Sequence, residues 1–111
     1  MHLKILVTPG DGIGPEVTLE AVRVLQEVMQ LSGHTYSIDQ RPIGGVAIVE
    51  FGTPLPEETL DAAFSSDAVL LGAVGGNEFN SLPPDKRPEA GLLQIRSALG
   101  GFANLRPAFA F

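Results

Sequence analysis

The side chains best suited to chemistry are gathered in one stretch near the end of the sequence. An acid, two leucines and an arginine follow one another at spacings that place them on one face of a predicted helix. These four residues are Glu89, Leu92, Leu93 and Arg96. A second arginine, Arg106, follows on a predicted strand. Leucines beside arginines suit a small ligand that carries a carboxylate at one end and a hydrocarbon group at the other.

A glycine-rich turn, Gly10–Pro15, lies between a predicted strand and a predicted helix. A standard dinucleotide-binding turn needs Gly-x-Gly-x-x-Gly and a helix N-terminus that is free to meet the pyrophosphate. Here the third glycine, Gly14, comes one residue early, Pro15 removes a donor, and Glu16 repels phosphate. The sequence therefore argues against a standard Rossmann site. A tight turn explains the glycines, while Asp11 and Glu16 would be acceptors beside a cofactor's base or ribose.

Composition narrows the class of protein. The chain has 111 residues, 44% of them hydrophobic, and a formal net charge of −6. It has no cluster of Lys and Arg, so neither nucleic acid nor an anionic membrane is an expected partner. No apolar run approaches the ~18 residues of a transmembrane helix, and the N-terminus lacks the pattern of a secretory signal. The lack of cysteines excludes disulfides and thiolate ligands. We expect a soluble, cytoplasmic protein.

Apolar runs and turn residues predict strands that alternate with helices. The predicted strands are Leu3–Thr8, Thr35–Gln40, Ala68–Val74 and Phe102–Arg106, and the predicted helices start at Gly14, Pro54 and Glu89 and end near Gly33, Ser66 and Leu99. Pro42–Phe51 is expected to be a loop with one or two helical turns. This order predicts an α/β fold, a mostly parallel sheet flanked by helices.

The same patterns predict which side chains face the core. In the first helix the expected inner stripe is Val17, Ala21, Val24, Leu25, Val28 and Leu31. In the second it is Leu60, Ala63 and Phe64, and the Ala68–Val74 strand is expected to be buried on both faces. Large aromatic side chains in the last ten residues have no polar tail after them. We therefore expect the fold to be incomplete at its C-terminal end, with residues 1–111 forming the N-terminal part of a longer protein.

Taken together, the motifs resemble those of the β-decarboxylating dehydrogenases of 2-hydroxy acids, the isocitrate/isopropylmalate dehydrogenase family. The resemblance runs through Gly10–Val17, Gly44-Gly45, Leu70–Gly76, Arg87-Pro88-Glu89 and Asn104–Pro107. It implies an isopropylmalate dehydrogenase-like fold, with this chain as the N-terminal part of the first α/β domain of a longer dehydrogenase. Members that act on isocitrate carry small polar side chains on the substrate helix. Leu92 and Leu93 instead match the members that accept the isopropyl group of 3-isopropylmalate.

The family resemblance also implies a reaction. The 2-hydroxyl of (2R,3S)-3-isopropylmalate would be oxidised with NAD, and loss of carbon dioxide would give 2-oxo-4-methylpentanoate in leucine biosynthesis. Mg²⁺ or Mn²⁺ would polarise the hydroxyl and then the ketone. The family's metal-binding aspartates and its catalytic tyrosine and lysine belong to parts of its chain beyond residue 111, and some come from the partner in a homodimer. No catalytic residue and no metal ligand is therefore assigned here, and the chain alone is expected to be inactive.

Carried over residue by residue, the resemblance assigns binding roles. Arg96, Arg106 and Leu92 would bind the substrate, while Leu93 would face the core. The residues expected near NAD are Ile13, Gly75, Gly76, Asn77 and Glu89. The loop from Gly76 to Glu89 would lie along the nicotinamide end, and the turn at Ile13 would approach the adenine side.

Three alternatives stay open at this stage. The chain could belong to a related tartrate, homoisocitrate or isocitrate dehydrogenase. It could also be part of a non-catalytic, carboxylate-binding regulatory subunit that keeps the arginines and lacks the chemistry. Finally, 111 residues could be the whole product, in which case we expect no dehydrogenase activity, poor solubility and weak carboxylate binding.

Overall fold

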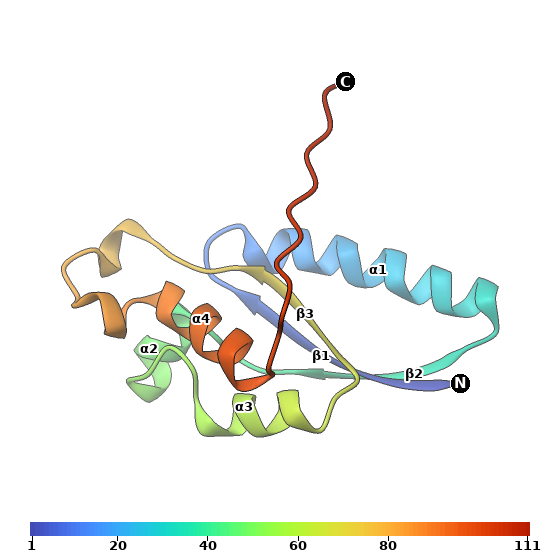
Figure 1. Cartoon of the computed structure of the whole chain (residues 1–111), viewed down its shortest axis with the longest axis horizontal. Helices are drawn as coiled ribbons and strands as arrows, with labels where there is room; N and C mark the ends of the chain where they lie inside the picture. The colour runs from blue at the N-terminus through green and yellow to red at the C-terminus, as the bar shows by residue number, and fades with distance from the viewer.

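A three-stranded parallel sheet forms the centre of the computed structural model, which describes all 111 residues (Figure 1). The strands are β1 (His2–Gly10), β2 (Thr35–Gln40) and β3 (Ala68–Ala73), in the order β2-β1-β3. β1 pairs in parallel with both neighbours, so that Ile5 lies opposite Ile38 on one side and Ala68 on the other. The predicted parallel α/β architecture is confirmed.

Helices cover both faces of this sheet (Figure 1). The helical elements are α1 (Gly14–Ser32), α2 (Gly45–Phe51), α3 (Glu57–Phe64) and α4 (Pro88–Ala98), with 3-10 turns η1 (Asn77–Phe79) and η2 (Pro84–Lys86) before α4. α1 lies on one face, and α3 and α4 lie on the other. Because β2 and β3 lie on opposite sides of β1, right-handed crossovers place the connecting helices on opposite faces. None of these helices has the length and apolarity that a membrane crossing requires.

The central strand supplies both halves of the core because its side chains alternate between the two faces. Ile5 and Val7 pack with Met29 of α1 on one face. Leu6 packs on the other face with a cluster formed by Ile43, Leu55, Ala62, Ala63 and Ile95. Leu6 is fully buried, so β1 is the strand that the two layers of helices share.

The inner face of α1 differs from the predicted one. Gly14, Thr18 and Met29 are buried, and Val22 and Leu25 pack beside them. Of the predicted stripe only Leu25 faces the sheet; its exposed members are Val17, Ala21, Val24, Val28 and Leu31. The helix carries two apolar stripes, and the stripe with small residues faces the sheet because α1 approaches β3 closely. The approach is so close that a Cβ on Gly72 of β3 would overlap the Thr18 hydroxyl.

Two other burial predictions are wrong in part, for local reasons. β3 is only half-buried along most of its length, because it is an edge strand in this sheet and is not covered on both sides. α3 begins at Glu57, with Pro56 as its cap residue, and is shorter than predicted. Of its predicted inner face, Ala63 is buried and Leu60 packs against the core, whereas Phe64 at the end of the helix is exposed. The other buried positions of α3 are Thr59 and Ala62.

The predicted strand Phe102–Arg106 does not form. Residues 101–111 are extended, exposed and without regular secondary structure, and they run away from the body of the molecule (Figure 1). A strand needs a hydrogen-bonding neighbour, and neither open edge of the sheet pairs with this segment. In contrast, the helical turns predicted within Pro42–Phe51 are confirmed as α2.

Gly91 in α4 gives a test of this packing. The helix lies so close to the connection between α2 and α3 that a Cβ on Gly91 would be 2.7 Å from the Pro54 carbonyl oxygen. Gly91→Ala should therefore lower the free energy of unfolding by about 1–2 kcal/mol, because overpacking outweighs the gain in helix propensity. Chemical denaturation measures the change. The exposed Ser97→Ala in the same helix serves as the control, and a stabilising Gly91→Ala would contradict the packing described here.

Candidate functional site at the sheet's carboxyl edge

The carboxyl ends of β1 and β3 lie side by side, with pairing that continues to Gly10 and Ala73. From there β1 continues into α1 on one face of the sheet, while β3 leads toward α4 on the other (Figure 1). Such a point of divergence at the carboxyl edge of a parallel sheet is where α/β proteins bind ligands. The predicted cofactor residues Ile13, Gly75, Gly76 and Asn77 lie on the two segments that leave these strands.

Asp11 connects these segments through a buried side chain. Its backbone N–H donates to the Ala73 carbonyl at 2.6 Å. Its carboxylate accepts hydrogen bonds from the backbone N–H groups of Gly45 at 2.7 Å, Val46 at 2.8 Å and Gly75 at 2.9 Å. Asp11 is only 8% exposed. Its oxygens are thus engaged inside the protein, contrary to the expectation that they would accept from a cofactor.

Gly75 and Glu89 meet at the same place although they lie on different elements. Gly75 has a φ of +117°, a conformation that favours glycine. A Cβ on Gly75 would be 2.7 Å from Oε1 of Glu89, which is exposed in the first turn of α4. The structure therefore brings two of the predicted cofactor residues together. An exposed carboxylate beside an open stretch of backbone suits hydroxyl or amide donors.

One face of α4 continues from Glu89, as the sequence predicts. The buried positions of this helix are Pro88, Ala90, Gly91 and Ile95. The other side of the helix carries Glu89, Leu92, Leu93 and Arg96. Leu92 is half-buried at the border with the core, whereas Leu93 is 63% exposed. The expectation that Leu93 faces the core is wrong, because Gly91 and Ile95 occupy that side.

The two arginines are not brought together. Arg96 is exposed, forms no ion pair, and lines a hollow of about 360 Å³ with Leu99 and residues 101–104. Arg106 lies beyond this hollow on the exposed extended segment. Arg96 is thus placed on the face of α4 that carries Leu92, while the position of Arg106 is not fixed by packing.

A hollow of about 350 Å³ opens at the divergence of β1 and β3. It is lined by Asp11, Gly12, Gly45, Val46, Val49, Glu50, Glu78 and Phe79. Glu78 and Phe79 lie in the Gly76–Glu89 loop that was expected near the cofactor, whereas no spacing in the sequence indicates Val46, Val49 or Glu50. Glu50 and Glu78 give this hollow an acidic border, and no Lys or Arg lines it. It therefore suits the cationic nicotinamide ring and the neutral ribose of oxidised NAD better than the anionic pyrophosphate.

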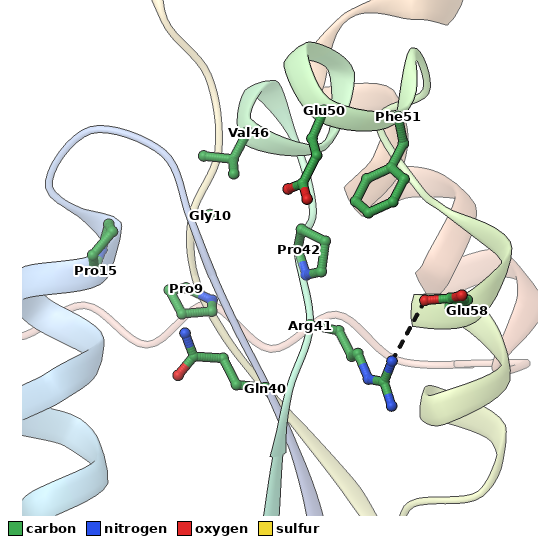
Figure 2. A pocket seen from close by; sticks show the side chains of 10 residues that line it. All are labelled: Pro9, Gly10, Pro15, Gln40, Arg41, Pro42, Val46, Glu50, Phe51 and Glu58. Carbon is green, nitrogen blue, oxygen red and sulfur yellow. Dashed lines mark ion pairs between the residues drawn. The ribbon is translucent and has the colours of Figure 1, made fainter.

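A larger hollow, of about 440 Å³, lies on the other side of the β1 terminus (Figure 2). Arg41 is its only basic side chain, and it pairs with Asp39 at 3.1 Å and with Glu58 at 3.5 Å. Glu50 also borders it and forms no ion pair. The basic charge is therefore already neutralised, and the hollow offers little to an anionic ligand. No group of three His, Asp or Glu side chains converges to hold a metal ion.

Arg87 organises the loop that joins the Gly76 turn to α4. Its Nε donates to the Leu82 carbonyl at 2.8 Å, and its Nη2 donates to the Asn80 carbonyl at 2.9 Å. A forked guanidinium can satisfy two backbone acceptors at once. Arg87 is also the residue that precedes α4, so these bonds fix the path of the chain that presents Glu89.

The sequence is similar to a known family and to curated proteins within it. Residues 4–111 match the isocitrate/isopropylmalate dehydrogenase family model. The chain is 59% identical over 107 residues to the 3-isopropylmalate dehydrogenase of Shouchella clausii, covering 96% of this chain and 29% of that protein. It is 56% identical over 111 residues to that of Nitratidesulfovibrio vulgaris, covering 100% and 31%. The chain thus spans less than a third of the length of these relatives.

Solved structures agree with this similarity. A β-decarboxylating dehydrogenase from Thermococcus kodakarensis superposes with a TM-score of 0.70 at 37% identity, over 88% of this chain and 27% of that one. An isocitrate dehydrogenase from Methylococcus capsulatus gives a TM-score of 0.51 at 36% identity, over 73% and 24%. In both cases the chain matches about a quarter of a longer chain.

Replacing the guanidinium of Arg87 tests its role in the loop. Arg87→Lys keeps the charge but cannot donate to both carbonyls in the same geometry, so we expect amide hydrogen exchange between Asn80 and Arg87 to accelerate about 10-fold. Exchange measured by mass spectrometry would show this. Lys86→Ala, at an exposed neighbouring position, is the control, and unchanged exchange in Arg87→Lys would show that the bonds do not hold the loop.

Proposed function

The chain belongs to the isocitrate/isopropylmalate dehydrogenase family, and we propose that it is the N-terminal part of the first α/β domain of a 3-isopropylmalate dehydrogenase. The complete enzyme would oxidise and decarboxylate (2R,3S)-3-isopropylmalate to 2-oxo-4-methylpentanoate in leucine biosynthesis. The observation that carries this proposal is the close approach of the Glu89 carboxylate to Gly75, where a Cβ would be 2.7 Å from Oε1. It joins the carboxyl edge of the sheet, where a cofactor would lie, to the face of α4 that carries an apolar and a basic group for a substrate.

NAD, when bound, would accept the hydride from the carbon that bears the 2-hydroxyl. The chain's own contribution would be to bind and orient its nicotinamide end. Gly75, Gly76 and Asn77 would provide backbone that a ligand can approach closely, and the exposed Glu89 carboxylate would accept hydrogen bonds from ribose hydroxyls or the carboxamide. Ile13, which is 65% exposed on the turn after β1, would offer an apolar contact to the adenine side.

The substrate would lie along the outer face of α4. Arg96 would pair with a carboxylate of the substrate, and this is supported by its exposure and its lack of an ion pair. Leu92, at the border of the core, would contact the isopropyl group, for which an apolar wall is favourable. Arg106 would complete the carboxylate site once its segment is held in place, and such charge-assisted contacts fix the orientation needed for hydride transfer.

The remaining catalytic groups would come from outside these residues. As in the family, a Mg²⁺ or Mn²⁺ ion, acid–base side chains and a homodimeric partner would complete the site, and the enzyme would work in the cytoplasm. This chain presents no metal-ligand cluster of its own. Residues 1–111 alone would therefore bind substrate weakly and would not catalyse the reaction.

Two alternative functions predict different results in binding and activity assays. A related tartrate, homoisocitrate or isocitrate dehydrogenase would prefer another 2-hydroxy acid, and the apolar Leu92 and Leu93 argue against the extra carboxylate of isocitrate. A regulatory subunit would bind carboxylates but form no NADH. The intact mass of the native product, followed by NADH formation from 3-isopropylmalate, isocitrate and tartrate with Mg²⁺, separates these cases. A native mass of 11.7 kDa would show that the dehydrogenase reading describes the relatives alone.

Substitution of Arg96 and Arg106 in the longer enzyme tests their proposed role in binding the substrate carboxylates. Arg96→Lys and Arg106→Lys should each lower kcat/KM for 3-isopropylmalate about 10- to 100-fold, because each loses a forked contact with a carboxylate. The KM for NAD should stay unchanged. Arg23→Lys, an exposed position on α1 paired with Glu20, is the matched control. Full activity in both site variants would rule out their role in substrate binding.

Leu92 should control selectivity between substrates with and without the isopropyl group. Leu92→Ala should lower the ratio of kcat/KM for 3-isopropylmalate over malate about 10-fold, because part of the apolar wall is lost. The measurement is steady-state kinetics with the two substrates. Leu31→Ala, at an exposed leucine of α1, should leave the ratio unchanged, and an unchanged ratio in Leu92→Ala as well would place the isopropyl group elsewhere.

A further inference from the structure

We infer that Asp11 is a positioning residue for the cofactor, acting through the backbone of the Gly75–Gly76 turn without touching the ligand. This inference rests on the proposed NAD site, because it concerns the turn against which the nicotinamide end would lie. It assigns to the acid of the glycine-rich turn a task different from the direct acceptor role that its sequence position suggests.

The contacts of the Asp11 carboxylate join segments that are far apart in the sequence. Oδ2 accepts hydrogen bonds from the N–H groups of Gly45 and Gly75, and Oδ1 accepts one from Val46. Gly45 and Val46 begin α2, and Gly75 follows β3. The side chain therefore fixes the distance between the start of α2 and the exit of β3, and it lines the hollow at the sheet edge together with Gly45 and Val46.

Two glycines allow the backbone to lie close to the Asp11 carboxylate. A Cβ on Gly44 would be 2.7 Å from Oδ2, and one on Gly45 would be 3.1 Å from the same atom. Gly44 also has a φ of +81°, a conformation that favours glycine. All three partners of the carboxylate are donors. A charged carboxylate is the one side chain of this size that offers acceptors only.

Gly75 depends on this contact for its position. Pairing between β3 and β1 ends at Ala73, so the Gly75 N–H has no partner in the sheet and donates to Asp11 instead. The same residue lies against Glu89. A displaced Gly75 would change both the open backbone and its relation to the Glu89 carboxylate, which are the features that the cofactor would contact. A purely structural role would instead affect stability and both ligands equally.

The test uses the longer enzyme with Asp11→Asn, which keeps the size of the side chain but turns one oxygen into a donor facing an N–H group. The measurements are NADH affinity by fluorescence, 3-isopropylmalate affinity by calorimetry, and amide exchange at Gly75. We expect NADH affinity to fall about 10-fold, 3-isopropylmalate affinity to change less than 2-fold, and Gly75 to exchange faster. Asp61→Asn, at an exposed position on α3, is the matched control and should change none of these.

The possible outcomes separate the inference from the proposed function. Unchanged NADH affinity, or equal losses for both ligands, would overturn the positioning role. If Asp11→Asn does not fold, Asp11→Glu keeps the charge and lengthens the side chain, and the same selective loss of NADH affinity is expected. If the unmodified enzyme binds no NADH, the proposed function fails. In that case, faster amide exchange in Asp11→Asn that is confined to Gly75, Gly45 and Val46 would still establish that Asp11 holds the turn. Unchanged amide exchange would exclude that role.

Discussion

The buried carboxylate of Asp11 is the interaction on which the geometry of the candidate site depends. A parallel sheet leaves its loops free at the carboxyl edge, because the ladder of hydrogen bonds ends with the strands. In this chain the ladder between β1 and β3 ends at Gly10 and Ala73. Beyond that point one side chain replaces it by accepting three backbone N–H groups. Gly10, Gly44 and Gly45 suit this arrangement, because a Cβ on Gly10 would overlap the Ala73 carbonyl and one on Gly44 or Gly45 would crowd the Asp11 carboxylate.

From this edge the site extends to α4 by a short path. Gly75 contacts Glu89, and Glu89 begins the helical face that continues through Leu92 to Arg96. Arg87 holds the intervening loop by two backbone carbonyls. An oxidation that transfers hydride needs its cofactor and its substrate side by side. In the proposed site the sheet edge would hold the cofactor and the adjoining face of α4 the substrate, both on a rigid scaffold.

Sequence patterns predicted the elements well and the burial of individual residues less well. Three of the four predicted strands, the major helices and the common face of Glu89, Leu92, Leu93 and Arg96 follow from periodicity and turn residues, which are local properties. The predicted inner face of α1 was wrong because the helix has two apolar stripes. The close packing of Gly14 and Thr18 against β3 determines which stripe faces the sheet. The Phe102–Arg106 strand was wrong because a strand depends on a neighbour that local sequence does not specify. The sequence singled out Asp11 as a hydrogen-bond acceptor but did not predict its partners, because they lie 34 to 64 residues away in the chain.

The most direct test is a crystal structure of the longer enzyme with NAD and Mg²⁺ bound. We predict that the nicotinamide end lies against Gly75 and Gly76, within hydrogen-bonding distance of Glu89. The Asp11 carboxylate should still accept hydrogen bonds from the three backbone N–H groups behind the turn. A nicotinamide bound elsewhere would contradict the proposed site, most plainly one in the hollow of Figure 2 between β1, β2 and α2.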